Sequence, residues 1–575
     1  MDTRRLILFV IFSFSLVMLW EAWQKQQLAL HAPPAVTVPG SAVPGPGAVP
    51  QPNTPLAVPG TAGAPGSASN SSPNNSVPAL PGAAVASSGA ATHAVVKTDL
   101  LTAAITSEGA SLDYLSFTKH KDSDDKDKDF VLFGTHSYAA QTGLLAQGLA
   151  LPTHQTPFTL APGTYEMKPG ENELKVRAEA VAGAVKVAKI YTFHRGSYVI
   201  DVNYEISNGG TTPIAPSAYL QLVRDDKAPA GETRFMHTFT GPAFYTDAQT
   251  FKKDDFSDIE KGKPVPIDPA DNGWVSMVQH YFASAWLPQG NARREFYSRK
   301  VGEGVYSAGV FLPVGTIAPG ATGSLSAKLF AGPQEVDALE AAAPHLERVK
   351  DYGWLDIPAR YMYQLLKWLH SYLGNWGLAI IALTVIIKLI FLPLSAASYK
   401  SMARMKKVTP KMTAIREKYG SDRMKMNQAM MELYKTEKIN PLGGCFPIVI
   451  QIPVFISLYW SLLATVEMRH APFYGWIHDL AAQDPYYILP IIMACSMFLQ
   501  TKMNPTPPDP VQAKMMTFMP IVFSIFFFFF PAGLVLYWVV NNVLSITQQY
   551  WISRVLAEKE PGDGKPKAAN DAKKK

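Results

Sequence analysis

One lysine lies inside an apolar stretch of this 575-residue chain. Lys388 belongs to the run Trp376–Leu394, six residues before its end. At about 1.5 Å per residue, it would lie roughly 9 Å from the end of a helix. A charge in the middle of a bilayer costs about 2.5 to 3.5 kcal/mol even on the most lenient insertion scale. We therefore expect Lys388 either to face a polar cavity or to extend its ammonium group to the nearer membrane surface.

Further polar residues recur at helical spacing in the neighbouring apolar runs. Thr384 precedes Lys388 by one helical turn, and Gln451 lies in a second run close to Pro453. A third run carries a polar stripe with the spacing i, i+4, i+8 and i+11, made of Tyr537, Asn541, Ser545 and Gln548. Because polar groups in lipid need partners, these residues predict one of two arrangements. They line a shared groove reached from the cytoplasm, or they form an ordinary hydrogen-bond network between helices.

Five apolar runs in the C-terminal part of the chain are candidates for membrane-spanning helices. They are Trp376–Leu394, Cys445–Thr465, Tyr486–Leu499, Met515–Phe530 and Gly533–Trp551. A spanning helix needs about 20 residues, within a range of about 17 to 25, so the third and fourth runs are short. Only Pro531 and Ala532 separate the last two runs. We therefore expect these two runs to form an antiparallel pair.

The basic residues indicate which ends of these runs face the cytoplasm. Residues 395–444 contain eleven Lys or Arg against four Asp or Glu, and residues 552–575 contain seven against four. The positive-inside rule places both segments in the cytoplasm. Residues 395–444 predict a helical hairpin whose many methionines form either a seam between the two helices or an adaptable apolar surface. The basic tail, residues 553–575, is either a solvated end or a contact for anionic lipid or RNA.

The N-terminal part predicts a membrane anchor followed by a tether. Arg4 and Arg5 precede an apolar run that ends at Trp20, and no clear cleavage motif follows it. We expect residues 1–25 to be an uncleaved anchor with a cytoplasmic N-terminus, with a cleaved signal peptide as the alternative. Residues 26–94 are rich in Pro, Gly, Ala and Ser and carry no charge. They predict a disordered linker, with a docking segment for a proline-binding module as the alternative.

Residues 95–350 predict a polar, strand-rich domain outside the membrane. The segment Tyr198–Ile206 alternates apolar and polar residues, as a half-buried strand does. Val185–Phe193 and Ser324–Phe330 give further strands, and together they indicate a large antiparallel β-sandwich. The domain contains no H-E-x-x-H motif, no G-x-S-x-G motif and no phosphate-binding loop of the G-x-x-x-x-G-K type, so we expect no enzymatic site in it.

Two helices are expected where this domain meets the membrane region. Glu335–Val349 predicts a short helix that leads back to the membrane. Residues 354–372 predict an amphipathic helix. It lies either in the outer membrane interface or packed on the outer domain.

Composition excludes several classes of protein. The net charge is +6, with 17% charged and 47% hydrophobic residues, but these averages combine three different compositions along the chain. A single soluble globule and a fully disordered chain are therefore both excluded. Cys445 and Cys495, the two cysteines, lie in apolar runs. Neither a disulfide framework nor a cysteine-based zinc or iron–sulfur site is expected.

Several motifs resemble the signature of the YidC/Oxa1/Alb3 family of membrane protein insertases. They are Asn440-Pro441-Leu442-Gly443-Gly444-Cys445-Phe446-Pro447, Gln451-Ile452-Pro453, Trp476-Ile477-His478-Asp479-Leu480, Asp484-Pro485-Tyr486-Tyr487-Ile488-Leu489-Pro490, Met516-Thr517-Phe518-Met519-Pro520 and Gly533-Leu534-Val535-Leu536-Tyr537-Trp538. The segments Gly273-Trp274-Val275 and Ala285-Trp286-Leu287-Pro288 are similar to the periplasmic domain of the Gram-negative branch. The resemblance implies a five-helix insertase core within residues 373–552, an N-terminal anchor helix and a periplasmic all-β sandwich domain. It also implies a location in the bacterial inner membrane, with both termini in the cytoplasm.

The same resemblance implies partners and site residues. The partners would be nascent membrane proteins, the Sec translocon, membrane lipids, and the ribosome through the hairpin and the basic tail. No DNA, cofactor, metal or catalytic residue is implied. The groove residue of the family is usually arginine, and Lys388 stands at the matching position, which keeps the charge but loses bidentate carboxylate pairing. Besides the polar residues named above, the expected substrate contacts are Pro453, Phe455, Phe518 and Trp538.

Two other classes of protein remain open at this point. A secondary transporter is one, because prolines that break apolar helices also mark solute sites, as at Pro393, Pro453, Pro490 and Pro520. A sugar-acting enzyme anchored by its tail is the other. Solute flux in vesicles would indicate the first, and activity of residues 95–349 alone would indicate the second.

Overall fold

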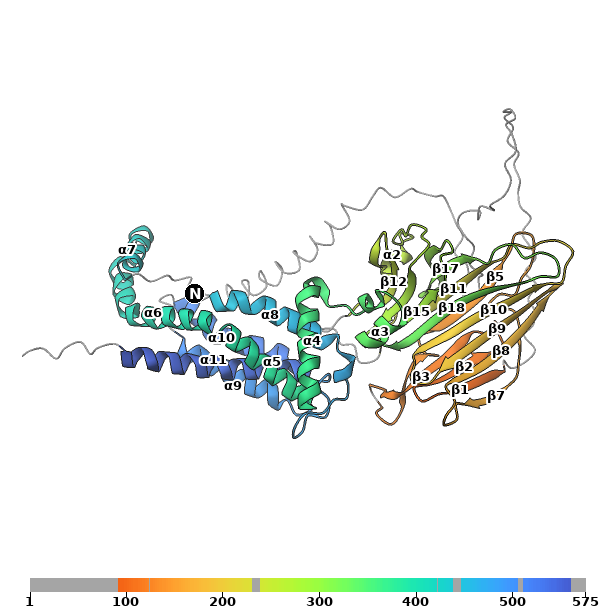
Figure 1. The fold of residues 1–575 in the computed structure, drawn as a ribbon. Coiled ribbons are helices and arrows are strands. Elements are labelled where there is room, and N and C mark those ends of the chain that lie inside the picture. Colours follow the sequence, from red (N-terminus) through yellow and green to blue (C-terminus); the bar gives the residue numbers. More distant parts are fainter. Residues whose placement is uncertain are drawn as a thin grey trace, which may run out of the picture. The chain divides into compact units, whose positions relative to one another are not determined.

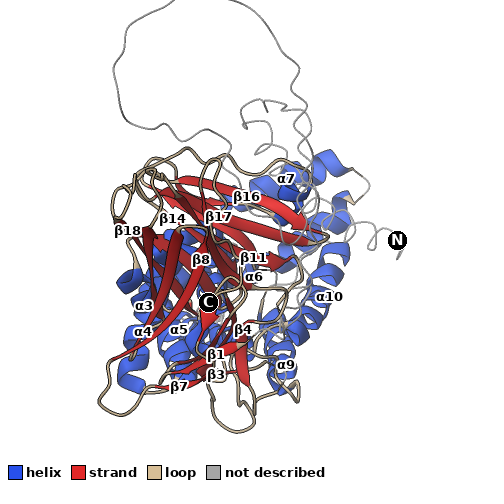
Figure 2. Ribbon diagram, turned by 90° about the vertical axis from the view of Figure 1, so that its right-hand side faces the viewer, coloured by secondary structure: helices blue, strands red, loops and turns tan. Residues whose placement is uncertain are grey.

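The computed structural model describes residues 92–123, 125–229, 238–420, 422–437, 446–504 and 510–559. The chain divides into two compact units, which meet along the sequence between Lys350 and Asp351. The described strands, red in Figure 2, belong to the first unit, and the long described helices, in blue, belong to the second. The predictions for the anchor, for residues 26–91 of the linker, for residues 560–575 of the tail and for the motif residues Asn440–Cys445 fall outside the described residues.

The first unit is a sandwich whose described strands form two nine-stranded sheets (Figure 1). The strands of one sheet are, in spatial order, β16 (Glu295–Gly302), β17 (Val305–Pro313), β11 (Ser217–Asp225), β5 (Ala139–Leu145), β3 (Leu112–Lys121), β2 (Leu101–Thr106), β1 (His93–Lys97) and β7 (Gly163–Glu166), with β4 (Asp129–Phe133) pairing with β3. The strands of the other are β13 (Thr250–Lys253), β12 (Gly241–Thr246), β14 (Trp274–Gln279), β15 (Phe282–Pro288), β18 (Thr322–Pro333), β10 (Val199–Asn208), β9 (Val185–His194), β8 (Glu173–Ala182) and β6 (Thr159–Leu160). One apolar core joins both sheets.

The alternation predicted for Tyr198–Ile206 is confirmed by β10. Its residues Ile200, Val202 and Tyr204 are buried, whereas Glu205 is exposed. β10 pairs with β9 and with β18, antiparallel in both cases, so the three predicted strands are neighbours. One pair at the edge of a sheet departs from the predicted antiparallel sandwich, because β1 and β7 pair in parallel.

The single helix predicted over Glu335–Val349 is also wrong. The segment forms α3 (Val336–Ala342) and a separate 3-10 turn, η1 (Leu346–Val349). Ala343 between them is extended, with φ −161° and ψ 153°. It precedes Pro344, and the proline ring disfavours helical backbone at the residue before it. A second short helix of this unit is α2 (Phe256–Glu260).

The second unit is helical. Its described elements are η2 (Gly353–Leu355), α4 (Asp356–Leu373), α5 (Trp376–Ile390), α6 (Leu392–Tyr419), α7 (Arg423–Thr436), α8 (Phe446–Leu463), η4 (Val466–Met468), α9 (Ile488–Met503), α10 (Pro510–Phe526), η5 (Phe527–Phe529) and α11 (Ala532–Lys559). The core residues Leu383, Leu458, Met493 and Val535 come from α5, α8, α9 and α11. α4 runs crosswise to these helices in Figure 1 and packs against α5 and α8.

The first apolar run does not form one helix to Leu394. α5 ends at Ile390, and α6 continues at an angle of 66°. Pro393 lies at the start of α6, where its missing N–H costs nothing. Among the residues that the structure describes, α5 and α6 together pass a test of length and composition for a membrane span, and no individual helix does.

α4 has two apolar faces rather than one. The buried residues Tyr363, Leu366 and Leu369 pack within the helical unit, and Tyr363 also hydrogen-bonds to Glu467. The exposed apolar residues include Ile357, Tyr361, Trp368 and Tyr372. One face of α4 thus packs within the helical unit, and the place of this helix in the membrane interface stays a prediction.

The cytoplasmic hairpin predicted from spacing corresponds to α6 and α7. Val408 and Met412 are buried between the two helices, with Met405 and Met430 against them. Met424 is 83% exposed. Some methionines thus form the seam and others lie on the surface, so the two interpretations from sequence apply to different residues.

Candidate functional site

Lys388 lies on α5, which packs against α11, and its side chain reaches Ser545 on that helix. The side chain is only 8% exposed, and its Nζ donates a hydrogen bond to Ser545 Oγ at 2.7 Å. Ser545 Oγ donates in turn to the carbonyl oxygen of Asn541 at 2.7 Å, which orients its lone pairs toward the ammonium group. Within the described part of the chain, no carboxylate lies within ion-pair distance of Lys388. The cation is therefore buried with a neutral partner.

Thr384 lies one turn before Lys388 on α5 and is fully buried. Its hydroxyl donates to the carbonyl oxygen of Ile380 at 2.7 Å, four residues back in the same helix. This internal bond satisfies the donor of a threonine inside an apolar helix. The hydroxyl oxygen keeps acceptor capacity on the same face of α5 as Lys388.

A second polar contact joins α8 to α11. Gln451 Nε2 donates to the hydroxyl of Tyr537 at 2.8 Å, and Tyr537 is buried. Phe455 follows Gln451 by one turn and lies with its ring centroid 6.4 Å from that of Tyr537. It also meets Trp538 edge-on, with 4.5 Å between ring centroids. The structure therefore brings these four predicted residues together.

The polar stripe of α11 also carries oxygen atoms without a donor. Asn541 Oδ1 and Gln548 Oε1 are buried and accept no hydrogen bond from any described residue. A buried unsatisfied acceptor costs about 1 to 3 kcal/mol. These two atoms are thus positions where a donor from a bound chain or from water would be stabilised.

Two predicted site residues lie apart from these contacts. Phe518 on α10 is 53% exposed and is not part of the described apolar core. Pro453 is also exposed, and its carbonyl oxygen accepts from Ser457 Oγ at 2.7 Å within α8. Both present apolar surface outward instead of lining the polar contacts.

Sequence reasoning missed a second polar face of α11. Asn542 Nδ2 donates to Ser496 Oγ at 3.1 Å, and Gln549 Nε2 donates to Asn504 Oδ1 at 3.2 Å. Asn542 and Gln549 are seven residues apart and so share a helix face, which the spacing could have revealed. The contact of Tyr399 on α6 with the carbonyl oxygen of Ser545, at 3.4 Å, has no signal in the sequence.

The part of the chain that the structure describes contains no group of three or more His, Cys, Asp or Glu side chains able to hold a metal ion. The polar groups of these contacts are amides, hydroxyls and one ammonium group. This set can bind a peptide or a carboxylate by hydrogen bonds and charge.

Comparison with known proteins identifies the family. The model of the 60Kd inner membrane protein matches residues 368–559, and that of the YidC periplasmic domain matches residues 93–365. The membrane protein insertase YidC of Aromatoleum aromaticum is 54% identical over 571 residues, which cover 98% of this chain and 100% of that protein. This chain belongs to the YidC family of membrane protein insertases.

A second relative agrees with this assignment. The membrane protein insertase YidC of Dechloromonas aromatica is 52% identical over 576 residues, covering 100% of both chains. A crystal structure of an active YidC insertase with its first transmembrane domain resolved covers 80% of this chain and 92% of that one, at 20% identity and a TM-score of 0.37. The predicted family and fold class, a helical membrane bundle with a periplasmic β-sandwich domain, are confirmed. As a member of this family, the chain is an inner-membrane insertase whose substrates are nascent membrane proteins.

Proposed function

We propose that the helical unit guides nascent membrane proteins into the bilayer along a hydrophilic groove between α5, α8 and α11, with Lys388 at its centre. The observation that carries this proposal is the burial of the Lys388 ammonium group against the neutral Ser545 hydroxyl. A buried cation is stabilised most by an anionic partner. An acidic segment of an incoming chain supplies that partner for as long as it is beside Lys388.

The energetics of insertion need no nucleotide. A nascent apolar helix gains roughly 0.3 to 0.6 kcal/mol per Leu-like residue in the bilayer core. The obstacle is the short polar flank that must cross, since unpaired polar groups in hydrocarbon cost several kcal/mol each. Thr384, Gln451 and Tyr537, with the acceptors of Asn541 and Gln548, offer hydrogen bonds along that path.

The apolar part of the client leaves sideways into lipid in this proposal. The exposed Phe518 and Pro453 present apolar surface outward, and Phe455 and Trp538 link that surface to the polar contacts. The groove is open to the cytoplasm and to lipid. No residue of the chain acts as a catalyst, and no cofactor takes part.

The proposal also assigns an orientation and further partners. The basic hairpin 395–444 and the tail 553–575 are cytoplasmic by the positive-inside rule and contact the ribosome, whose RNA attracts lysine and arginine. The N-terminus lies on the same side, anchored by residues 1–25 and joined by the linker 26–94 to the periplasmic domain 95–350. Residues 354–372 lie in the outer interface and residues 373–552 form the insertase core. The chain acts alone for small clients and with the Sec translocon for larger ones.

The test uses the purified chain in vesicles and two versions of one small client that differ only in having an acidic or a neutral flank. Insertion is measured as protease protection of the newly made client. With Lys388→Ala, we expect insertion of the acidic version to fall about tenfold, the equivalent of about 1.4 kcal/mol, with a much smaller change for the neutral version. The matched control is Lys388→Arg, which keeps the charge.

Equal insertion of both client versions by Lys388→Ala would contradict the electrostatic role of Lys388. Solute flux through the vesicles without insertion of either version would contradict the groove itself.

A further inference from the structure

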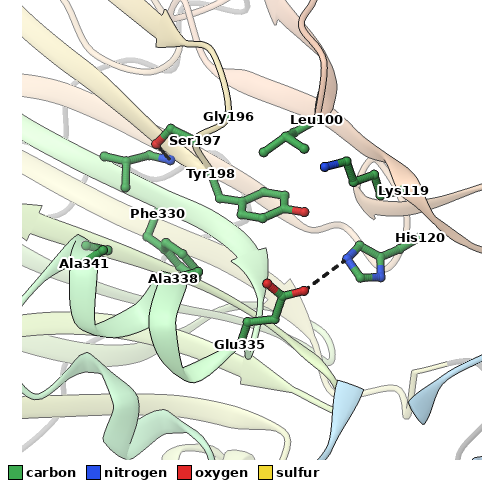
Figure 3. A pocket seen from close by; sticks show the side chains of 12 residues that line it. Leu100, Lys119, His120, Gly196, Ser197, Tyr198, Phe330, Glu335, Ala338 and Ala341 are labelled. Atoms are coloured by element: carbon green, nitrogen blue, oxygen red, sulfur yellow. Dashed lines mark hydrogen bonds and ion pairs between the residues drawn. The ribbon is translucent and has the colours of Figure 1, made fainter. Parts of the chain in front are cut away.

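A cavity of about 390 Å³ lies within the sandwich domain, at a place where its two sheets and α3 meet (Figure 3). Lys119 and His120 come from β3 of one sheet, and Phe330 comes from β18 of the other. Tyr198 immediately precedes β10, and Glu335 immediately precedes α3. This volume is at the small end of the range of about 300 to 1,000 Å³ that is typical of ligand pockets.

The wall of the cavity is divided into an apolar side and a polar side. The apolar side is formed by Leu100 and Phe330 with alanines of α3 that include Ala338 and Ala341. On the polar side, His120 Nε2 and Glu335 Oε1 lie 4.0 Å apart. Figure 3 shows Lys119 on this polar side, and its side chain is exposed at the rim.

The hydroxyl of Tyr198 points from the wall into the cavity (Figure 3). The residue is only 9% exposed, and its ring packs edge-on against Phe117 with 5.8 Å between centroids. Residues 92–559, as far as the structure describes them, give this hydroxyl no hydrogen-bond partner. Burial, and next the charge of Glu335, raise the pKa of Tyr198, so the hydroxyl stays protonated and is a donor.

The charges around the cavity balance. Lys119 disfavours a cationic ligand, and Glu335 disfavours an anionic one. What remains is a neutral ligand that offers hydroxyl groups, which both donate and accept, on one side and C–H groups on the other. A pyranose ring has this division, with an apolar face of C–H groups and an edge of hydroxyls.

We propose that this cavity is a binding site for a small neutral polyol of monosaccharide size. The apolar face of the ring lies against Phe330 and the alanines of α3. Its hydroxyl groups accept from Tyr198 and donate to Glu335. The site belongs to the sandwich domain and does not depend on the insertion groove.

The test is saturation-transfer NMR with methyl β-D-glucopyranoside and methyl β-D-galactopyranoside on the full chain, in a detergent that has no sugar head group. We expect saturable transfer from the protein to at least one glycoside. Tyr198→Phe removes only the hydroxyl and should weaken binding about fivefold, as expected for the loss of one neutral hydrogen bond. Ala338→Leu fills the apolar side and should abolish binding. The matched control is Tyr165→Phe, which removes an exposed hydroxyl outside the cavity that donates to Ala161.

Three results would overturn the proposal. One is the lack of saturable transfer to either glycoside in the unsubstituted chain. Another is glycoside binding that neither Tyr198→Phe nor Ala338→Leu alters, in chains whose unfolding temperature matches that of the control. The third is stronger binding of leucine than of the glycosides, because a zwitterion would then be the ligand.

Discussion

Lys388 and Lys189 are both buried, and they differ in what surrounds them. Lys388 has one neutral hydroxyl partner in the helical unit. Lys189, in the core of the sandwich, donates to the carbonyl oxygens of Gly109 at 2.5 Å and Thr142 at 2.9 Å. Its Nζ also lies 4.8 Å from the ring centroid of Phe158. Burial lowers the pKa of Lys189 to about 7. A neutral amine still donates both of these hydrogen bonds, so this lysine can be structural without a charge.

The lowered pKa of Lys189 predicts how the stability of the sandwich depends on pH. The unfolded chain holds the proton up to pH about 10.4, whereas the folded domain releases it above about 7. Between these values the unfolded state binds more protons, so the free energy of unfolding rises with pH, by at most about 1.4 kcal/mol per pH unit. Below pH 7 this contribution is constant. Calorimetry of the full chain at several pH values, read at the unfolding transition of the sandwich domain, measures this dependence.

Lys189→Met is the control for this pH dependence, because it fills a similar volume without a titrating group. The increase in the free energy of unfolding between pH 7 and 10 should be smaller in Lys189→Met, by the contribution of one titrating proton. The same slope in both chains would show that Lys189 is not the group responsible.

At the level of elements, sequence patterns predicted helices and strands well but not their ends. The alternation of apolar and polar residues in β10 and the apolar run of α5 are local signals, carried by neighbouring residues. The break before Pro344 follows from the limits that a proline sets on the residue before it, and the bend of 66° after α5 falls where Pro393 has no N–H to continue that helix. Because Pro344 and Pro393 are local features of the sequence, both breaks are encoded in it.

Asp484 sets the start of α9. Its buried carboxylate accepts from the backbone N–H of Leu489 at 2.7 Å and of Tyr486 at 3.0 Å, and from Trp476 Nε1 at 3.0 Å. We expect Asp484→Ala to lower the free energy of unfolding by about 2 kcal/mol, because it leaves buried donors unpaired. Asp484→Asn keeps one acceptor oxygen and should lose less. Thermal unfolding in detergent compares the two, and equal losses would contradict this role.

The seam of the hairpin gives a prediction for α6 and α7. Met412 is 3% exposed and Met424 is 83% exposed. Met412→Ala should destabilise the pairing of the two helices by about 2 kcal/mol, at the low end for a buried methionine because the cluster is small. Met424→Ala should change it by less than about 0.5 kcal/mol. The rate of limited proteolysis within the hairpin measures the difference, and equal rates would show that the seam does not hold the helices together.

For the whole molecule, composition was enough to separate a strand-rich unit from a helical one. The candidate site was predicted in part. The polar stripe of α11 follows from helical spacing, but the neighbour that each face meets depends on how the helices are rotated, which no local pattern encodes. For this reason Gln451 and Tyr537 were expected in one polar group but not as a direct hydrogen-bonded pair. The contact of Asn542 with Ser496 was missed for the same reason.

The central claim is that an incoming chain passes between α5, α8 and α11. A photoreactive amino acid at position 451, where Gln451 meets Tyr537, tests it against a ribosome stalled with a partly inserted membrane protein. The matched position is Val543, which is exposed on α11. The account predicts a strong crosslink to the nascent chain from position 451 and a weak one from position 543. Insertion that proceeds with no crosslink from position 451 would contradict it.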